Sequence, residues 1–103
     1  MNDAVGRYQK LLEQFPDNEL ARFSLGKAYF DLGQFAAAKE QFALALARKP
    51  DWMAAQILAG KCELAVGNRA AAKTAFERAR QLALAQAHEG PLEEMNQLLG
   101  EMA

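Results

Sequence analysis

The chain is short of the residues on which catalysis, metal binding and disulfides depend. Its 103 residues include one cysteine, Cys62, and one histidine, His88. A lone cysteine excludes an internal disulfide, and one cysteine with one histidine cannot complete a closed zinc site. A nucleophile needs a base within reach, and the sequence shows no such constellation. We therefore predict that the protein is not an enzyme and binds no metal or cofactor. Cys62 is expected to be buried, and His88 to be exposed near a helix end. The lone cysteine also favours a cytoplasmic location.

Two further absences restrict the partners. The formal net charge is −1, so the basic stripe typical of a nucleic-acid interface is missing. No apolar run approaches the roughly 18 residues of a membrane span, and the first residues lack the pattern of a signal peptide. We expect neither nucleic acid nor a membrane as a partner. The charge is nevertheless uneven, because residues 89–103 hold four Glu and no Lys or Arg.

What the chain does contain is an internal repeat. Residues 36–42, AAAKEQF, return 34 positions later as AAAKTAF at residues 70–76. The same shift places Pro16 on Pro50 and Gly33 on Gly67. Similarity at a fixed period of this size indicates stacked units of secondary structure, each of which covers the apolar face of its neighbour.

Within each unit the apolar residues recur with helical spacing. Residues 19–32 and 35–48 each carry an apolar stripe, and the pattern returns at residues 52–66 and from residue 69 onward. Gly33 and Gly67 separate the paired helices, and Pro50 ends a unit, with Asp51 placed to cap the next helix. No period-two strand pattern occurs, so the predicted fold is all-α.

The repeat resembles the tetratricopeptide repeat, a 34-residue helix–turn–helix. The first full copy fills that family's signature positions with Leu25, Gly26, Tyr29, Ala38, Phe42, Ala45 and Pro50. The second copy keeps Gly60, Ala72, Phe76 and Ala79, with Ala59 at the leucine position. It departs from the family pattern at Glu63, where an aromatic residue is usual, and at Leu84, where proline is usual. The small residues, Gly26 and Gly60 among them, let paired helices approach closely, with Phe42 and Phe76 filling the space between them. Ala4, Tyr8, Leu11 and Pro16 match the second half of a preceding copy.

The resemblance implies one domain, residues 1–103, built as a short right-handed superhelix of about six antiparallel helices. Its expected parts are a half-repeat helix at 1–16, repeats at 17–50 and 51–84, and a capping helix at 91–103. Without proline at Leu84, the fifth helix is expected to continue to about His88, where Gly90 and Pro91 end it. The capping helix carries the apolar stripe Leu92, Met95, Leu98, Leu99 and Met102.

The first helix of each repeat is apolar on a second face as well, whereas a solvated helix would keep that face polar. In the resembling family this face lines a concave groove that takes extended or helical peptides. We therefore expect a protein–protein interaction module that binds a peptide or helix of acidic and apolar character. The expected contact residues are Leu20, Phe23, Lys27, Phe30, Ile57, Lys61 and Leu64. Phe23 and Leu58 stand where carboxylate-clamping members carry polar groups, so no such clamp is expected.

The alternative is a structural or self-assembly module. In that interpretation the groove is filled by the protein's own C-terminal helix or by another subunit. The half-repeat lacks its own first helix, which leaves part of its apolar stripe without a partner and makes it a candidate homodimer surface. The residues expected there are Val5, Tyr8, Leu12 and Phe15.

Overall fold

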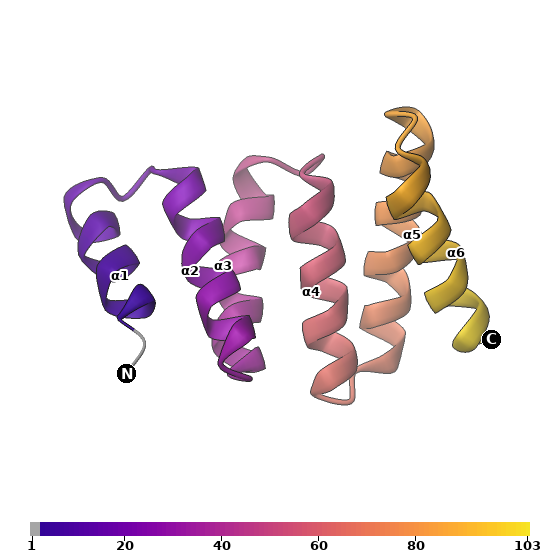
Figure 1. Ribbon diagram of the computed structural model, residues 1–103, viewed down its shortest axis with the longest axis horizontal. Helices are drawn as coiled ribbons and strands as arrows, with labels where there is room; N and C mark the ends of the chain where they lie inside the picture. The colour runs from indigo at the N-terminus through magenta and orange to yellow at the C-terminus, as the bar shows by residue number, and fades with distance from the viewer. Residues whose placement is uncertain (1–2) are drawn as a thin grey trace.

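The computed structural model describes residues 3–103, which form six helices and no strand. The helices are α1 (Ala4–Gln14), α2 (Glu19–Asp31), α3 (Phe35–Arg48), α4 (Met53–Ala65), α5 (Arg69–Ala85) and α6 (Glu89–Glu101). Each helix packs against the next one in the chain, and α2 also approaches α4. The result is an elongated stack of 41 × 27 × 20 Å, with α1 at one end and α6 at the other (Figure 1). The all-α prediction is confirmed.

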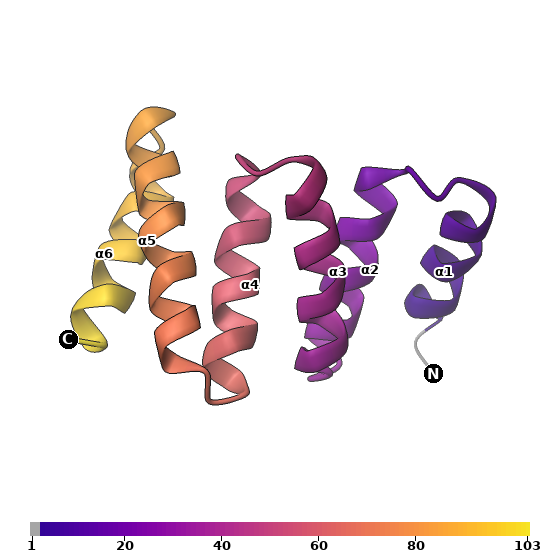
Figure 2. The ribbon, with the colours of Figure 1, turned by 180° about the vertical axis from the view of Figure 1, so that it is seen from behind.

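The helices form two layers. In Figure 1, α2, α4 and α6 lie toward the viewer with α3 and α5 behind them, and Figure 2 shows the same stack from behind. The turns after α2 and α4 depend on Gly33 and Gly67, whose φ angles of 76° and 88° lie in the left-handed region. That conformation costs glycine little, and it reverses the chain so that each repeat folds as a helical hairpin.

Two buried clusters hold the layers together. Phe42, Ala38 and Cys62 have no exposed surface and join α3 to α4. Phe76, Ala72, Ala79 and Met95 do the same for α5 and α6. A buried side chain of the size of Phe or Met contributes about 1.5–3 kcal/mol by leaving water. Each cluster therefore joins the second helix of one repeat to the helix that follows it in the chain.

The starts of α2 and α4 differ in their caps. Asn18 Oδ1 accepts a hydrogen bond from the backbone N–H of Ala21 at 3.0 Å, which satisfies an otherwise unpaired donor of the first turn of α2. At the equivalent place before α4 the N-cap residue is Trp52, which makes no side-chain capping bond. The prediction that Asp51 caps α4 is wrong, because the cap position lies two residues after the proline in both repeats.

The boundary between α5 and α6 also differs from the expectation. Helix α5 ends at Ala85 rather than near His88, and α6 begins at Glu89 rather than at Pro91. Ala87 takes a left-handed φ of 56°, and the His88 N–H then bonds back to the Ala83 carbonyl at 2.9 Å. Pro91 falls in the first turn of α6, where the missing N–H costs nothing.

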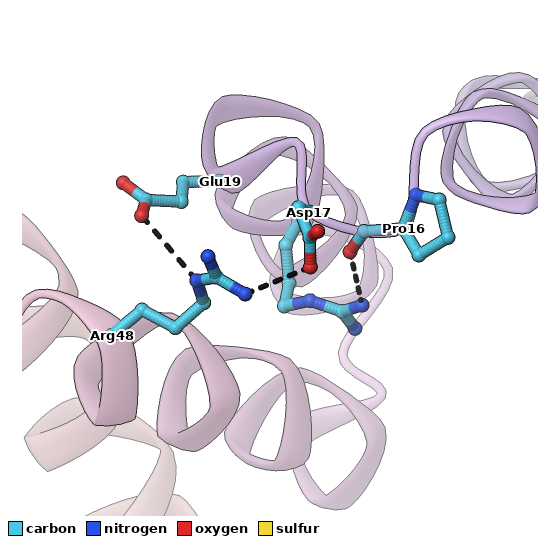
Figure 3. A network of polar contacts seen from close by, with 5 residues as sticks. Pro16, Asp17, Glu19 and Arg48 are labelled. Atoms are coloured by element: carbon cyan, nitrogen blue, oxygen red, sulfur yellow. Dashed lines mark hydrogen bonds and ion pairs between the residues drawn. The ribbon is translucent and has the colours of Figure 1, made fainter.

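An arginine cluster links α3 to the segment before α2. Arg48 Nη1 lies 2.8 Å from Asp17 Oδ1, and its Nε lies 3.5 Å from Glu19 Oε1 (Figure 3). Arg22 on α2 donates to the Pro16 carbonyl at 3.3 Å and to Gln41 of α3 at 3.0 Å. These contacts fix the start of α2, which is the end of the helix that presents Leu20.

Candidate binding groove

The structure places the seven predicted contact residues on two neighbouring helices of one layer. Leu20, Phe23, Lys27 and Phe30 belong to α2, and Ile57, Lys61 and Leu64 belong to α4. These two helices lie side by side in the layer that faces the viewer in Figure 1. The 34-residue period gives them matching positions, so Phe23 corresponds to Ile57 and Lys27 to Lys61.

The seven residues differ in how much surface they offer. Leu20 is 68% exposed and Leu64 is 37% exposed, and Lys27 also lies open to solvent. Phe23, Phe30, Ile57 and Lys61 are half-buried. Phe30 packs edge-on against Phe35 with ring centroids 5.4 Å apart, and Ile57 packs on the cluster between α5 and α6. The open apolar surface is therefore carried mainly by Leu20 and Leu64.

Phe23 contributes to the fold as well as to the surface. Its ring stacks on Trp52 with centroids 4.7 Å apart and lies tilted to Phe42 at 5.7 Å. Trp52 in turn has the Lys49 ammonium 5.4 Å from its ring centroid. Replacing Phe23 would disturb packing between α2, α3 and α4, so Leu20 is the better probe of binding.

Trp52 was not among the residues that the sequence singled out. It lines an open cleft of about 560 Å³ with Lys49, Asp51, Met53, Ala54 and Gln86. The signal available in the sequence was that the only tryptophan of the chain lies between a turn proline and a helix start. Aromatic residues that are partly exposed and have one polar edge are common at protein interfaces.

Lys27 and Lys61, the two lysines among the predicted contact residues, already have acidic neighbours within the chain. Lys61 Nζ lies 3.1 Å from Glu94 Oε2 on α6, and Lys27 Nζ lies 3.5 Å from Asp31 Oδ2 one turn further along α2. The sequence indicated Glu94 as part of an acidic tail, but not as a partner of Lys61. Pairing across helices depends on the register of α6, which the sequence alone did not supply.

Helix α6 continues the stack rather than covering α2. It packs on α5 through Met95, and it makes no close backbone approach to α2. Arg69 donates to the Met102 carbonyl at 3.0 Å and Arg80 to Asn96 at 2.6 Å, so the middle and the C-terminal end of α6 are tied to α5. The C-terminal helix thus leaves the predicted contact residues of α2 uncovered.

Of the predicted self-association residues, Val5, Tyr8 and Leu12 lie on α1 and Phe15 directly follows it; α1 contains no fully buried residue. Val5, Tyr8 and Leu12 are half-buried, and Phe15 is 57% exposed. Leu12 lines an open cleft of about 510 Å³ between α1, α2 and α3, together with Gln9, Glu13, Arg22, Leu25, Tyr29 and Gln41. The Gln9 side chain donates to the Tyr29 hydroxyl at 2.9 Å and links α1 to α2.

The single cysteine and the single histidine of the chain lie in different settings. Cys62 is buried, and that burial, with the nearby charge of Glu63, raises the pKa of its thiol to about 11 against the opposing effect of Lys39. His88 is exposed at the start of α6. Residues 3–103 contain no group of three or more His, Cys, Asp or Glu arranged to hold a metal ion. None of their helices has the length and apolar character that crossing a bilayer would need.

A family model for the tetratricopeptide repeat matches residues 1–62, which is more than half of the chain. The chain belongs to the tetratricopeptide repeat family. A TPR repeat-containing protein of Pseudomonas aeruginosa, PA0015, is 37% identical over 70 residues, which cover 68% of this chain and 67% of that protein. The family assignment from the repeated residues is thereby confirmed.

Solved structures agree with the tetratricopeptide fold. Protein BPP2914 from Bordetella parapertussis superimposes with a TM-score of 0.86 at 31% identity, covering 99% of this chain and 89% of that one. PcrH from Pseudomonas aeruginosa, in complex with the chaperone binding region of PopD, superimposes with a TM-score of 0.90 at 25% identity. That match covers 97% of this chain and 76% of the PcrH chain.

Proposed function

We propose that this protein is an interaction module that binds a peptide or helix of another protein across α2 and α4. The observation that carries the proposal is the apolar surface left on this layer, where Leu20 is 68% exposed and Leu64 37% exposed. A partner would cover these leucines and pair an acidic side chain with Lys27. PcrH, a tetratricopeptide neighbour with this arrangement of helices, has been crystallised with a segment of PopD.

Phe23, Phe30, Ile57 and Lys61 complete the proposed contact surface. Their half-buried side chains form its floor, so they set its shape while Leu20 and Leu64 supply the surface that binding would bury. Full burial of one leucine contributes about 1.5–3 kcal/mol before the costs of association. Those costs are about 4–15 kcal/mol, so a stable complex also needs contributions from the floor residues and from the ion pair at Lys27.

The test compares two leucines that are exposed on opposite layers. Leu20→Gln removes the most exposed apolar residue of the groove, and Leu44→Gln makes the same change on α3, where Leu44 is 45% exposed. Peptides selected by wild-type protein from a random library displayed on phage are titrated against both variants. We expect at least about tenfold weaker binding to Leu20→Gln, in line with the loss of one buried leucine, and unchanged binding to Leu44→Gln. Equal effects of the two changes would show that the groove is not the binding surface.

The second candidate function is self-association through α1. It is favoured by the 57% exposure of Phe15 and by the absence of any fully buried residue in α1. Val5, Tyr8 and Leu12 would complete this surface. Sedimentation equilibrium at high micromolar concentration is expected to show a dimer. Phe15→Ser should dissociate this dimer. Leu84→Ser, the control at a similarly exposed leucine of α5, should leave it intact. A strict monomer at that concentration would rule this candidate out.

A further inference from the structure

Helix α6 occupies the same structural position as α4, shifted by 33 residues instead of 34. Cys62 on α4 and Met95 on α6 are both fully buried. Cys62 packs in one cluster with Ala38 and Phe42, and Met95 packs in the other with their counterparts Ala72 and Phe76. Cys62 and Met95 are therefore equivalent, which makes α6 the third helix of the groove layer.

This register identifies a row of charged residues across the groove. Lys27 on α2 corresponds to Lys61 on α4 by the shift of 34, and Lys61 corresponds to Glu94 on α6 by the shift of 33. The ion pair of 3.1 Å between Lys61 Nζ and Glu94 Oε2 shows independently that these two positions are neighbours. The row thus reads lysine, lysine, glutamate, and its sign reverses at α6.

The apolar character of the layer ends at the same helix. By the shift of 33, Ile57 corresponds to Gly90 and Leu64 to Gln97, so α6 carries neither apolar side chain. Residues 89–103 contain four Glu and no Lys or Arg. A uniformly acidic segment that crossed all three helices would meet favourable charge at Lys27 and repulsion at α6.

We propose that the groove selects a segment with mixed charge, placing an acidic side chain at Lys27, apolar side chains over α2 and α4, and a Lys or Arg at Glu94. This inference rests on the function proposed above. The side chains of Lys27 and Asp31 are 55% and 56% exposed, so the Lys27 ammonium is accessible to a partner's carboxylate. The Glu94 side chain is 45% exposed, and its carboxylate has lone pairs for a second donor beside Lys61.

The expected spacing of the two charges follows from helix packing. Helices packed directly on one another have axes about 8–10 Å apart. Helix α2 approaches α4 over a short stretch only, and α4 makes no close backbone approach to α6, so the row from α2 to α6 spans more than about 16–20 Å. An extended chain needs at least about five or six residues to cover this span at ~3.3 Å per residue. The acidic and basic side chains of a bound extended segment should therefore be separated by at least that number of positions.

The test uses a random seven-residue peptide library displayed on phage, with three proteins as bait. These are the wild type, Glu94→Lys, and the control Glu93→Lys, which makes the same charge change on the adjacent exposed residue of α6, outside the row. Wild type and Glu93→Lys are expected to recover peptides with one acid and one base flanking apolar residues. Glu94→Lys is expected to recover peptides with acids at both ends.

Affinities then separate the local contact from bulk charge. Replacing the basic residue of a selected peptide by alanine is expected to weaken binding to wild type by about two- to fivefold, the range of one exposed ion pair. The same peptide change should have no effect on binding to Glu94→Gln, which lacks the carboxylate. This neutral variant also serves as the test if the charge reversal in Glu94→Lys disturbs the packing of α6 through Met95. The stacked ring of Trp52 makes its fluorescence a suitable readout.

The outcomes distinguish the two proposals. Peptides whose binding depends on Leu20 but whose charges are the same for wild type and Glu94→Lys would overturn the charge inference and leave the groove function standing. A change of preference in Glu93→Lys equal to that in Glu94→Lys would also overturn it, because bulk charge would then explain both. Recovered peptides that are indifferent to Leu20→Gln would refute the groove function and the inference together.

Discussion

The glycines at the centres of α2 and α4 set how closely the paired helices approach. A Cβ atom built on Gly60 would lie 2.5 Å from Phe76 Cε1, and one on Gly26 would lie 2.7 Å from Phe42 Cε1. Both phenylalanines are fully buried. The sequence predicted this close approach from the small residues and the repeated phenylalanine, and the structure confirms it.

We expect Gly60→Ala to lower the free energy of unfolding by about 1–3 kcal/mol, because overpacking outweighs the gain in helix propensity. Gly6→Ala is the matched control, since no described atom lies within 4 Å of the added Cβ in α1. That variant should be stabilised by about 0.5–1 kcal/mol. Urea denaturation of both measures the difference, and stabilisation of Gly60→Ala would show that Phe76 yields easily.

Glu63 occupies the position where the family usually has an aromatic residue, and it replaces that contact with an ion pair. Its carboxylate lies 2.9 Å from Lys39 Nζ on α3, and the Asn68 side chain donates to it at 3.3 Å. The hydrogen bond from Lys39, against the opposing effect of burial, holds the pKa of Glu63 below its usual value of 4.5. The departure from the family pattern was visible in the sequence, but the partner on α3 was not.

A lowered pKa in the folded state links this pair to acid stability. The contribution of Glu63 is fully present above about pH 4.5, the usual value, and is lost as the pH falls through the lower folded-state pKa. Glu63→Gln should therefore lower the melting temperature at pH 7 and differ less from wild type toward pH 3. Glu40→Gln, at an exposed residue of α3, is the control, and a pH-independent difference for Glu63→Gln would contradict the linkage.

At the level of whole elements, the turn between α5 and α6 is the least favourable of the three turns in residues 3–103 that contain a residue with left-handed φ. Ala87 has a φ of 56°, in the left-handed region. The corresponding left-handed residues of the other two turns, Gly33 and Gly67, are glycines, which adopt this conformation at little cost. A left-handed conformation costs a residue with a Cβ about 1 kcal/mol relative to glycine. Ala87→Gly should therefore raise the free energy of unfolding by about 0.5–1 kcal/mol, and Gly67→Ala should lower it by at least as much. Thermal unfolding checks both, and a destabilised Ala87→Gly would show that chain entropy dominates.

The same turn explains where helix prediction from the sequence succeeded and where it did not. The bounds of α3 agree with the expected 35–48 because a glycine turn and a proline enclose it. The end of α5 was placed too late because no glycine marks it. Pro91 was expected to be the first residue of the last helix because proline suits a first helical turn, but α6 begins two residues earlier, at Glu89. A single residue of shift in α6 then decides that Glu94, and not its neighbour, faces Lys61.

Across the whole molecule, the repeat period was enough to predict the layers but not which groove residues are accessible. Period and spacing assign Leu20 and Phe23 to the same helix face, yet one is 68% exposed and the other stacks on Trp52. That difference comes from a residue in the loop before α4, which lies almost 30 positions away and follows no repeat signature. Contacts of this kind depend on tertiary geometry that a periodic pattern does not encode.

A stack in which helices contact mainly their chain neighbours should lose stability locally. Met95 is fully buried and joins α6 to α5, so Met95→Ala leaves a cavity that costs about 2–5 kcal/mol at this end. In a quasi-one-dimensional array the loss is expected to fall on the terminal layers first. Amide hydrogen exchange should then show reduced protection in α5 and α6, while α2 and α3 keep theirs. Leu84→Ala, at a 52% exposed residue of α5, should change neither region. Equal loss of protection in all helices would mean that the whole stack unfolds as one cooperative unit.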